Sequence, residues 1–293
     1  MKTMSLNKTF LLGIGAQKAG TTWLHRQLCK NNFFDPGFTK EYHTFDSIYA
    51  SKYADWTDSW LKKLAEIDDS TASNRQKKAS LLKRLLFVYE PKTYFDYFKK
   101  LANSKPEIKL VCDITPSYSI LDTNAFTHIK RGLNKKGFQV KVIFLMRDPV
   151  ERIWSARRMK RRHAQTTGGY VNPNIEASIL KSIDNEGSTM KTDYKRTIQT
   201  IDNIFHQEDI FYGFFEDLFT QSTFERLKNF LMLDLASPDF DESINSSPKN
   251  DELSEELTKK IIFKYRDTYN FVNQRFDGAA EKLWTSNYRL AQL

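Results

Sequence analysis

A glycine-rich turn between an apolar run and a helical pattern constrains this chain more than any other feature. The run Phe10–Ala16 has the composition of a buried strand, and Thr21–Lys30 carries apolar side chains at helical spacing. The turn from Gly13 to Gly20 reads GIGAQKAG. Small residues at such a junction let several backbone N–H groups converge on one anion, beside the positive end of the helix dipole. The sequence therefore predicts a strand–turn–helix unit that binds an anion.

The order of residues in this turn argues against an ATP or GTP site. In the Walker pattern a lysine directly follows the second glycine, and a serine or threonine comes next. Here Thr21 follows Gly20, and Lys18 stands two residues before that glycine. Anion binding is still expected, because Lys18 adds positive charge and Thr21 and Thr22 add hydroxyl donors. The alternative is a glycine turn that serves only tight packing between the strand and the helix.

Short β-rich runs alternate with helical patterns along the rest of the chain. The runs cover Lys109–Thr115, Val140–Met146 and Ile210–Phe215. Helical patterns cover Pro149 to His163, Ile175–Asn185, Thr192–Phe205, Thr223–Met232 and Ser254–Gln274. This alternation predicts an α/β fold with a parallel sheet and helices on both faces. We expect one domain over residues 1–293, with a mostly helical insertion at about 49–104 and a polar loop over Pro238–Asn250.

Charge is spread unevenly along the chain. Residues 1–200 carry 35 Lys and Arg against 19 Asp and Glu, whereas residues 201–293 carry 10 against 17. A basic amino-terminal part indicates an anionic ligand or partner, without distinguishing a nucleic acid, an acidic polymer or a phosphorylated cofactor. Five basic residues within one predicted helix form either a solvated face or a patch that attracts an anionic acceptor. They are Arg157, Arg158, Lys160, Arg161 and Arg162.

The hydropathy and the cysteine content of the chain indicate the cellular compartment in which the protein is expected. No stretch of about 18 apolar residues is present, so we expect no membrane-spanning helix. Met1–Gln17 resembles a short secretory signal, but a glycine-rich turn and a helix follow at once, so we interpret it as part of the fold. Cys29 and Cys112 are too few for a disulfide framework and are interpreted as reduced thiols. A cytoplasmic protein is therefore expected.

A second anion site is predicted where another strand ends. Arg147 directly follows the run Val140–Met146, and Asp148 is the N-cap candidate of the next helix. Ligands of open α/β sheets bind beyond the carboxyl ends of the strands, so Arg147 and the glycine-rich turn are expected to face one crevice. A planar guanidinium suits a terminal phosphate, and Ser155, about two turns into the helix, adds a hydroxyl. The alternative for Arg147 is a salt bridge to Asp148 or Glu151.

Both segments resemble the nucleotide-binding motifs of sulfotransferases that use 3′-phosphoadenosine 5′-phosphosulfate (PAPS). QKAGTTWL is similar to their 5′-phosphosulfate loop, and RDPVERIWS is similar to their 3′-phosphate motif. The resemblance implies a P-loop-like fold and adenosine 3′,5′-bisphosphate as product. No metal is expected, because the sequence shows no His/Cys cluster at ligand spacing. The residues that the resemblance assigns to the 5′-phosphosulfate are Lys18, Ala19, Gly20, Thr21, Thr22 and Trp23. It also places Arg147 and Ser155 at the 3′-phosphate and Tyr194 near the adenine. Lys18 would in addition stabilise the charge that builds on the bridging oxygen.

The segment Lys40–Asp46 resembles the Lys-Glu-x-x-x-Phe stretch of the carbohydrate-modifying branch of that family, which includes the heparan sulfate enzymes. The resemblance implies that Glu41 removes the proton of the acceptor hydroxyl, with Lys40 near the transferring sulfonate. His43 is the competing base, since the small-molecule branch uses a histidine. The alternative is that Glu41 and His43 are ordinary loop residues.

Asp113–Tyr118 resembles the segment that lines the acceptor cleft in the same branch, which implies that Thr115 and Tyr118 contact the acceptor. Ile114 stands where the family commonly has lysine, and this departure weakens the inference of a sulfated or uronic-acid glycan. Two other stretches contribute no site residue. Phe211–Leu218 resembles a late structural strand, and Asn245–Asn250 matches the family's cofactor-closing loop poorly.

Together these motifs predict a PAPS-dependent sulfotransferase that moves a sulfuryl group to a hydroxyl of a saccharide or another small hydroxylated molecule. One alternative is a nucleotide-dependent small-molecule kinase, which the position of the lysine disfavours. The other is a non-enzymatic polyanion-binding protein, favoured only by the basic charge. We expect no specific nucleic-acid partner. The identity of the acceptor and the oligomeric state do not follow from the sequence.

Overall fold

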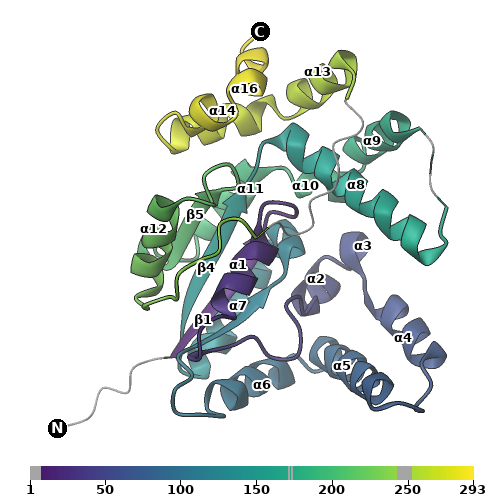
Figure 1. Cartoon of the computed structure of the whole chain (residues 1–293), viewed down its shortest axis with the longest axis vertical. Helices are drawn as coiled ribbons and strands as arrows, with labels where there is room; N and C mark the ends of the chain where they lie inside the picture. The colour runs from purple at the N-terminus through teal and green to yellow at the C-terminus, as the bar shows by residue number, and fades with distance from the viewer. Residues whose placement is uncertain (1–7, 171, 173, 243–252) are drawn as a thin grey trace.

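Five parallel strands form the central sheet in the computed structural model, which describes residues 8–170, 172, 174–242 and 253–293. The strands lie in the order β2-β3-β1-β4-β5 (Figure 1). Their bounds are β1 Lys8–Gly15, β2 Phe34–Asp35, β3 Leu110–Ile114, β4 Phe138–Met146 and β5 Ile210–Phe214. β1, β3 and β4 are buried along nearly their whole length, as parallel strands covered on both faces are. The predicted α/β fold with a parallel sheet is confirmed.

β1 occupies the middle of the sheet, and its register aligns the ends of three strands. Leu12 of β1 lies opposite Asp113 of β3 and Val142 of β4. The chain leaves β1 toward the β2 side and leaves β4 toward β5, so the connections after these two neighbours diverge. Such a divergence opens a crevice beyond the carboxyl ends of the strands. The glycine-rich turn and Arg147 both follow strands at this edge.

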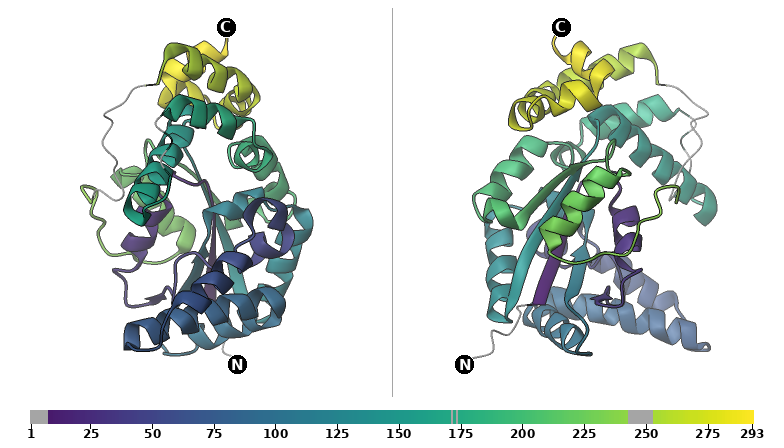
Figure 2. Two further views of the ribbon diagram at one scale, coloured as in Figure 1. Left: turned by 90° about the vertical axis from the view of Figure 1, so that its right-hand side faces the viewer. Right: turned by 60° about the vertical axis from the view of Figure 1, so that its left-hand side comes forward.

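Helices cover both faces of the sheet (Figure 2). On one face, α1 and α12 line a small apolar cavity with Trp23 and Leu24 from α1 and Phe224 and Leu227 from α12. On the other face, α7 packs on β4 and against α11. The bounds of these helices and of the helices that follow β4 are α1 Thr21–Leu28, α7 Thr123–Lys135, α8 Pro149–Thr167, α9 Ile175–Ile183, α10 Glu186–Met190, α11 Tyr194–Asp202 and α12 Gln221–Leu231. The carboxyl-terminal helices gather at one end of the molecule (Figure 1); they are α13 Glu255–Lys264, α14 Arg266–Arg275, α15 Ala279–Leu283 and α16 Thr285–Ala291.

The region predicted as a helical insertion is helical. α2 Thr44–Tyr49 leads into it, and its helices are α3 Ser51–Ala54, α4 Thr57–Glu66, α5 Ala72–Tyr89 and α6 Lys92–Ala102. Aromatic contacts tie it to the sheet: the ring of Phe98 lies 4.7 Å from that of Phe10 in β1 and 5.0 Å from that of Tyr42. Tyr42 is therefore a buried anchor in the middle of the segment that carries Lys40, Glu41 and His43. That the whole chain is one domain stays a prediction.

The structure departs from the predicted elements in several places. The sequence patterns do not predict α7, although a crossover helix is the usual connection between parallel strands such as β3 and β4. β2 has only two residues, too few to show a strand pattern. The helix predicted over Ser254–Gln274 is two helices that break at Tyr265. The predicted loop Pro238–Asn250 lies outside the described residues from position 243 onward.

Candidate active site

The glycine-rich turn contains two residues with left-handed backbone before α1 begins. Lys18 has φ 72° and Gly20 has φ 90°. A Cβ at Gly20 would lie 2.3 Å from Cδ2 of Leu218, so glycine suits this position both in conformation and in space. α1 begins at Thr21 without a side-chain cap, and the first amide groups of a helix have no partner within it. The turn therefore has the geometry of an anion site.

Lys18 lies in a concentration of positive charge. Burial and, after it, repulsion by neighbouring cations lower the pKa of Lys18 to about 8. The cations that act on it are Arg162, Arg147, Arg158 and Lys40. They come from α8, from the end of β4 and from the segment before α2. An anion bound in the turn would relieve this repulsion, so the charge of the site fits an anionic ligand.

Arg147 joins the two predicted anion motifs. Its Nη1 donates a hydrogen bond to the backbone carbonyl of Lys18 at 3.1 Å. Its Nη2 lies 3.1 Å from Oε2 of Glu151, and its guanidinium carbon lies 4.1 Å from the ring centre of Phe215. The structure thus brings Arg147 to the turn, as predicted, and also forms the alternative salt bridge to Glu151. Nε of Arg147 is buried and has no hydrogen-bond partner among the described residues.

Neighbouring side chains hold Arg147 in place. The hydroxyl of Tyr194 donates to the backbone carbonyl of Arg147 at 2.7 Å, and Tyr194 is fully buried. Asp148 accepts hydrogen bonds from the amides of Val150 and Glu151 at 2.8 and 3.1 Å, so it caps α8 as predicted. Tyr194 therefore positions the motif through the backbone. Ser155 is half-buried on α8.

Lys40 and Glu41 reach the turn from the segment before α2. Nζ of Lys40 lies 3.4 Å from Oγ1 of Thr21 and 2.5 Å from Oε1 of Glu41. The other carboxylate oxygen of Glu41 lies 3.4 Å from Nε2 of His43. Burial alone would raise the pKa of Glu41, but the hydrogen bond with His43 and the adjacent Lys40 charge lower it to about 2. Glu41 is therefore ionised at neutral pH.

His43 is held between two carboxylates. Its Nδ1 lies 2.7 Å from Oδ2 of Asp46, and Ser117 donates to the same oxygen. Burial lowers the pKa of His43, but hydrogen bonds to Asp46 and Glu41 outweigh that effect and raise the pKa to about 9. At neutral pH His43 already carries its second proton, so it has no nitrogen free to accept one. The sequence did not identify Asp46 or Ser117, because their role depends on contacts made only in the folded chain.

Thr115 and Tyr118 lie beneath this segment, and both are fully buried. Oγ1 of Thr115 accepts from the amide of Tyr42 at 2.9 Å and donates to Asp113 at 2.6 Å. The hydroxyl of Tyr118 accepts from the amide of Thr44 at 3.2 Å and donates to Asp113 at 2.8 Å. The acceptor contact expected for Thr115 and Tyr118 does not fit this burial. They support the backbone that carries Glu41 and His43.

Trp23 also points away from the turn. It is 3% exposed, and its indole N–H donates to the backbone carbonyl of Asp239 at 2.9 Å. Its ring lies against Phe219 and Phe240. Trp23 therefore offers a ligand only its backbone amide, whereas its side chain packs α1 against the segment after α12.

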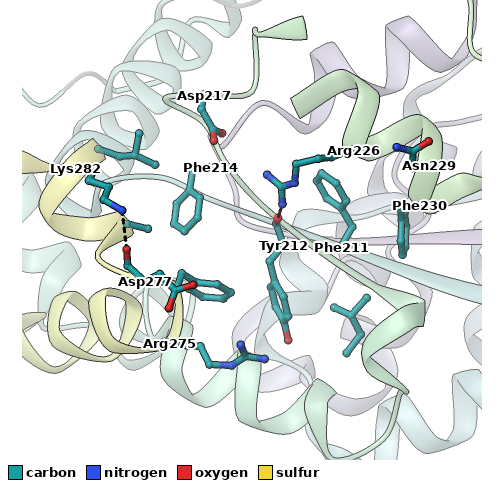
Figure 3. A pocket seen from close by; sticks show the side chains of 14 residues that line it. Phe211, Tyr212, Phe214, Asp217, Arg226, Asn229, Phe230, Arg275, Asp277 and Lys282 are labelled. Atoms are coloured by element: carbon teal, nitrogen blue, oxygen red, sulfur yellow. Dashed lines mark hydrogen bonds between the residues drawn. The ribbon is translucent and has the colours of Figure 1, made fainter. Parts of the chain in front are cut away.

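A separate cavity of about 810 Å³ follows the outer edge of β5 (Figure 3). The charged side chains that line it include Arg226, Arg275 and Lys282, beside the rings of Phe211 and Phe214. No site residue predicted from the sequence is among the described residues that line it. Lys18, Arg147, Lys40 and Glu41 instead lie around the turn, away from this groove.

Fold and site together define a parallel α/β protein with basic side chains gathered at the carboxyl edge of its sheet. The model of the sulfotransferase family matches residues 11–236, so the chain belongs to that family. Its fold is similar to that of a sulfotransferase from Alicyclobacillus acidocaldarius, with a TM-score of 0.57 and 13% identity. That comparison covers 92% of this chain and 96% of the other.

Weaker structural similarities concern two sulfotransferase domains. The domain of the Synechococcus olefin synthase has a TM-score of 0.41 and 17% identity, over 78% of this chain and 74% of that chain. The domain from the curacin biosynthetic pathway has a TM-score of 0.43 and 16% identity, over 78% and 75%. No curated protein matches the sequence. None of these findings identifies the carbohydrate-modifying branch.

No helix within 8–170, 174–242 or 253–293 is long and apolar enough to span a membrane. In the same part of the chain, no group of three or more His, Cys, Asp or Glu side chains is arranged to hold a metal ion.

Proposed function

We propose that this protein transfers a sulfuryl group from PAPS to a hydroxyl of a small acceptor. The observation that carries the proposal is the contact between Arg147 and Lys18, which sets the two predicted anion motifs side by side. Lys18, Thr21, Thr22 and the amides from Ala19 to Trp23 would hold the 5′-phosphosulfate. Arg147 and Ser155 would bind the 3′-phosphate, and Tyr194 would keep Arg147 in position.

The residues present fit such a donor substrate. The cations around Lys18 repel one another until an anion binds, and the buried Nε of Arg147 lacks a partner among the described residues. In the reaction, the acceptor oxygen forms a bond to sulfur while the bond from sulfur to the bridging oxygen breaks. Lys18 stabilises the charge that develops on that bridging oxygen, and adenosine 3′,5′-bisphosphate leaves.

Glu41 is the base that this arrangement supports. The hydroxyl proton of the acceptor passes to Glu41, because that carboxylate is ionised whereas His43 is already protonated. The low pKa of Glu41 makes it a weak base while Lys40 is paired with it. Lys40 lies beside Thr21 and would turn to the sulfonate of the donor, which would leave Glu41 free to accept the proton. His43, fixed by Asp46, orients the carboxylate.

We propose a saccharide as the acceptor, on the resemblance of Lys40–Asp46 to the carbohydrate-modifying branch. Other small hydroxylated molecules are the alternative. The test is transfer of radiolabelled sulfur from PAPS to a panel of hydroxylated acceptors, with Lys18→Ala as the inactive control. ATP with Mg²⁺ is the comparison donor. Transfer from PAPS without added metal supports the proposal, whereas phosphoryl transfer from ATP would support the kinase alternative.

A further inference from the structure

A small basic pocket lies beside the turn, between α8, α9 and α10, which are neighbours in the fold (Figure 1). Its volume is about 60 Å³, several times the roughly 10–15 Å³ that one water molecule needs. The basic side chains that line it are Arg152, Arg157, Lys160 and Lys191. Ser182 and Ser188 add hydroxyls, and neither Asp nor Glu is among the described residues that line it.

Arg152 is the buried member of this pocket. It is 3% exposed, and Nη2 donates to Oγ1 of Thr192. Nε is buried and has no hydrogen-bond partner in the part of the chain that the structure describes. A buried guanidinium without a carboxylate is costly, and burial accordingly lowers the pKa of Arg152. An oxyanion in the pocket would supply the missing acceptor.

Burial and repulsion by neighbouring cations also act on Lys160 and Lys191. Burial and the charge of Arg157 lower the pKa of Lys160. Burial and the charges of Arg152 and Lys160 lower the pKa of Lys191, which the carboxylate of Asp46 opposes. Arg157 has one neutral partner, the hydroxyl of Ser178, at 3.2 Å from its Nη1. The pocket therefore carries more positive charge than its lining neutralises.

The pocket is distinct from the residues assigned to the 3′-phosphate. At about 100° per residue, Ser155, Arg158 and Arg162 lie within about 60° of one another around α8. Arg157 and Lys160 lie roughly 140–160° from Ser155, and Arg152 lies between the two sets. Arg158 and Arg162 act on Lys18, whereas the second set lines the pocket. Helix α8 thus carries two basic surfaces.

The pocket also adjoins the centre of the proposed transfer. Gln17, which lines it, precedes Lys18 in the turn. The carboxylate of Asp46, which forms a hydrogen bond with His43, acts to raise the pKa of Lys191. A group bound in the pocket would thus lie beside the turn and within the electrostatic reach of Asp46.

We propose that the acceptor carries an oxyanion group, such as a phosphate, sulfate or carboxylate, which binds among Arg152, Arg157, Lys160 and Lys191 while its hydroxyl faces Glu41. This inference rests on the proposed function. It narrows the class of acceptor to anionic molecules. On such an acceptor, the oxyanion that binds in the pocket and the hydroxyl that reacts are two different groups.

The test uses inorganic phosphate as the probe, titrated by calorimetry into the full chain with adenosine 3′,5′-bisphosphate in excess. The variant is Arg157→Ala with Lys160→Ala, which keeps buried Arg152 in place. The matched control removes two exposed lysines outside the pocket, Lys181→Ala with Lys195→Ala. We expect phosphate affinity to fall about tenfold or more in the pocket variant and to stay within about twofold in the control. The affinity for the bisphosphate should be unchanged in both.

The outcomes separate this inference from the proposed function. Unchanged phosphate binding in the pocket variant overturns the inference. A loss of bisphosphate affinity alone overturns it too, because the pocket would then serve the nucleotide. If the bisphosphate fails to bind the unaltered protein, the proposed function fails, yet the phosphate comparison still reports on the pocket.

A kinetic comparison extends the test to acceptors. Glucose and glucose 6-phosphate, or glycerol and glycerol 3-phosphate, differ only in the anionic group. We expect the phosphorylated member of a pair to have the lower KM, and the pocket variant to erase that difference without a matching loss of kcat. Equal KM values for both members of every pair in the unaltered enzyme would count against the inference.

Discussion

Arg147 and Lys18 are 129 residues apart in the chain, yet Nη1 of Arg147 donates to the carbonyl oxygen of Lys18 at 3.1 Å. The contact joins the ends of the neighbouring strands β1 and β4. It fixes the distance between two groups of cations, one in the turn and one at the start of α8. A ligand with anionic groups at two ends suits this arrangement better than a ligand with one.

Replacing Arg147 should weaken binding through the 3′-phosphate alone. We expect Arg147→Ala to reduce the affinity for adenosine 3′,5′-bisphosphate about tenfold to a hundredfold, because charge-assisted hydrogen bonds are lost. The same substitution should change the affinity for adenosine 5′-monophosphate little, because that nucleotide lacks the 3′-phosphate. Isothermal titration of both nucleotides checks this, and equal losses for the two would place the 3′-phosphate elsewhere.

Lys18 should affect the rate more than ground-state binding. We expect Lys18→Ala to lower kcat about 10²–10³-fold, because a positive charge at the bridging oxygen stabilises the transition state. Steady-state rates at saturating PAPS measure the effect. Lys181→Ala, an exposed lysine on α9, serves as the control. A Lys18→Ala enzyme with normal kcat and a raised KM for PAPS would show that the side chain only binds.

Glu41 and His43 should separate in their effects on turnover. Glu41→Gln keeps the shape of the side chain and removes the base, so we expect kcat to fall about 10²–10⁴-fold. His43→Gln removes the group that orients Glu41 and should cost less. Single-turnover rates of both variants provide the comparison. The reverse order of effects would identify His43 as the base.

The charge of His43 should make stability depend on pH. Its pKa is raised to about 9, so its protonation stabilises the fold fully below about pH 6.5, the usual pKa of histidine. That contribution is lost as the pH rises through about 9. The difference in unfolding free energy between the unaltered protein and His43→Gln should therefore shrink from pH 6 to pH 9.5 in urea titrations. A constant difference over this range would mean that His43 is not charged in the fold.

Replacing Tyr118 should lower the free energy of unfolding more than it changes the KM for the acceptor. Tyr118→Phe removes a buried hydroxyl that donates to Asp113 and accepts from the amide of Thr44, and we expect a loss of about 1–3 kcal/mol. Tyr170→Phe, at a side chain 85% exposed, should change stability little. Urea unfolding of the two variants measures this. A stable Tyr118→Phe with a raised KM for the acceptor would restore the contact predicted from sequence.

Local patterns carried most of what the sequence could predict. The turn before Thr21 and the cap at Asp148 depend on residues next to them in the chain, so spacing alone identifies both. The strands could be predicted because continuous apolar runs, in a chain that is otherwise rich in charged residues, are typical of buried parallel strands. Even the proximity of Arg147 to the turn follows from a general rule about the edges of parallel sheets.

Burial and pairing could not be predicted in the same way. Thr115 and Tyr118 resemble cleft residues, but whether a hydroxyl faces a cleft or a backbone amide depends on where Tyr42 and Thr44 lie in the folded chain. The charge state of His43 depends on Asp46 and on Glu41, each at a distance that spacing does not fix. The basic face of α8 likewise divides into two surfaces only once its neighbours are known.

A crystal structure with adenosine 3′,5′-bisphosphate tests the central claim most directly. We predict one nucleotide with its 5′-phosphate on the amides of the turn near Lys18 and its 3′-phosphate on the guanidinium of Arg147. A nucleotide bound in the groove along β5, or in the crevice without contact to Arg147, would contradict it.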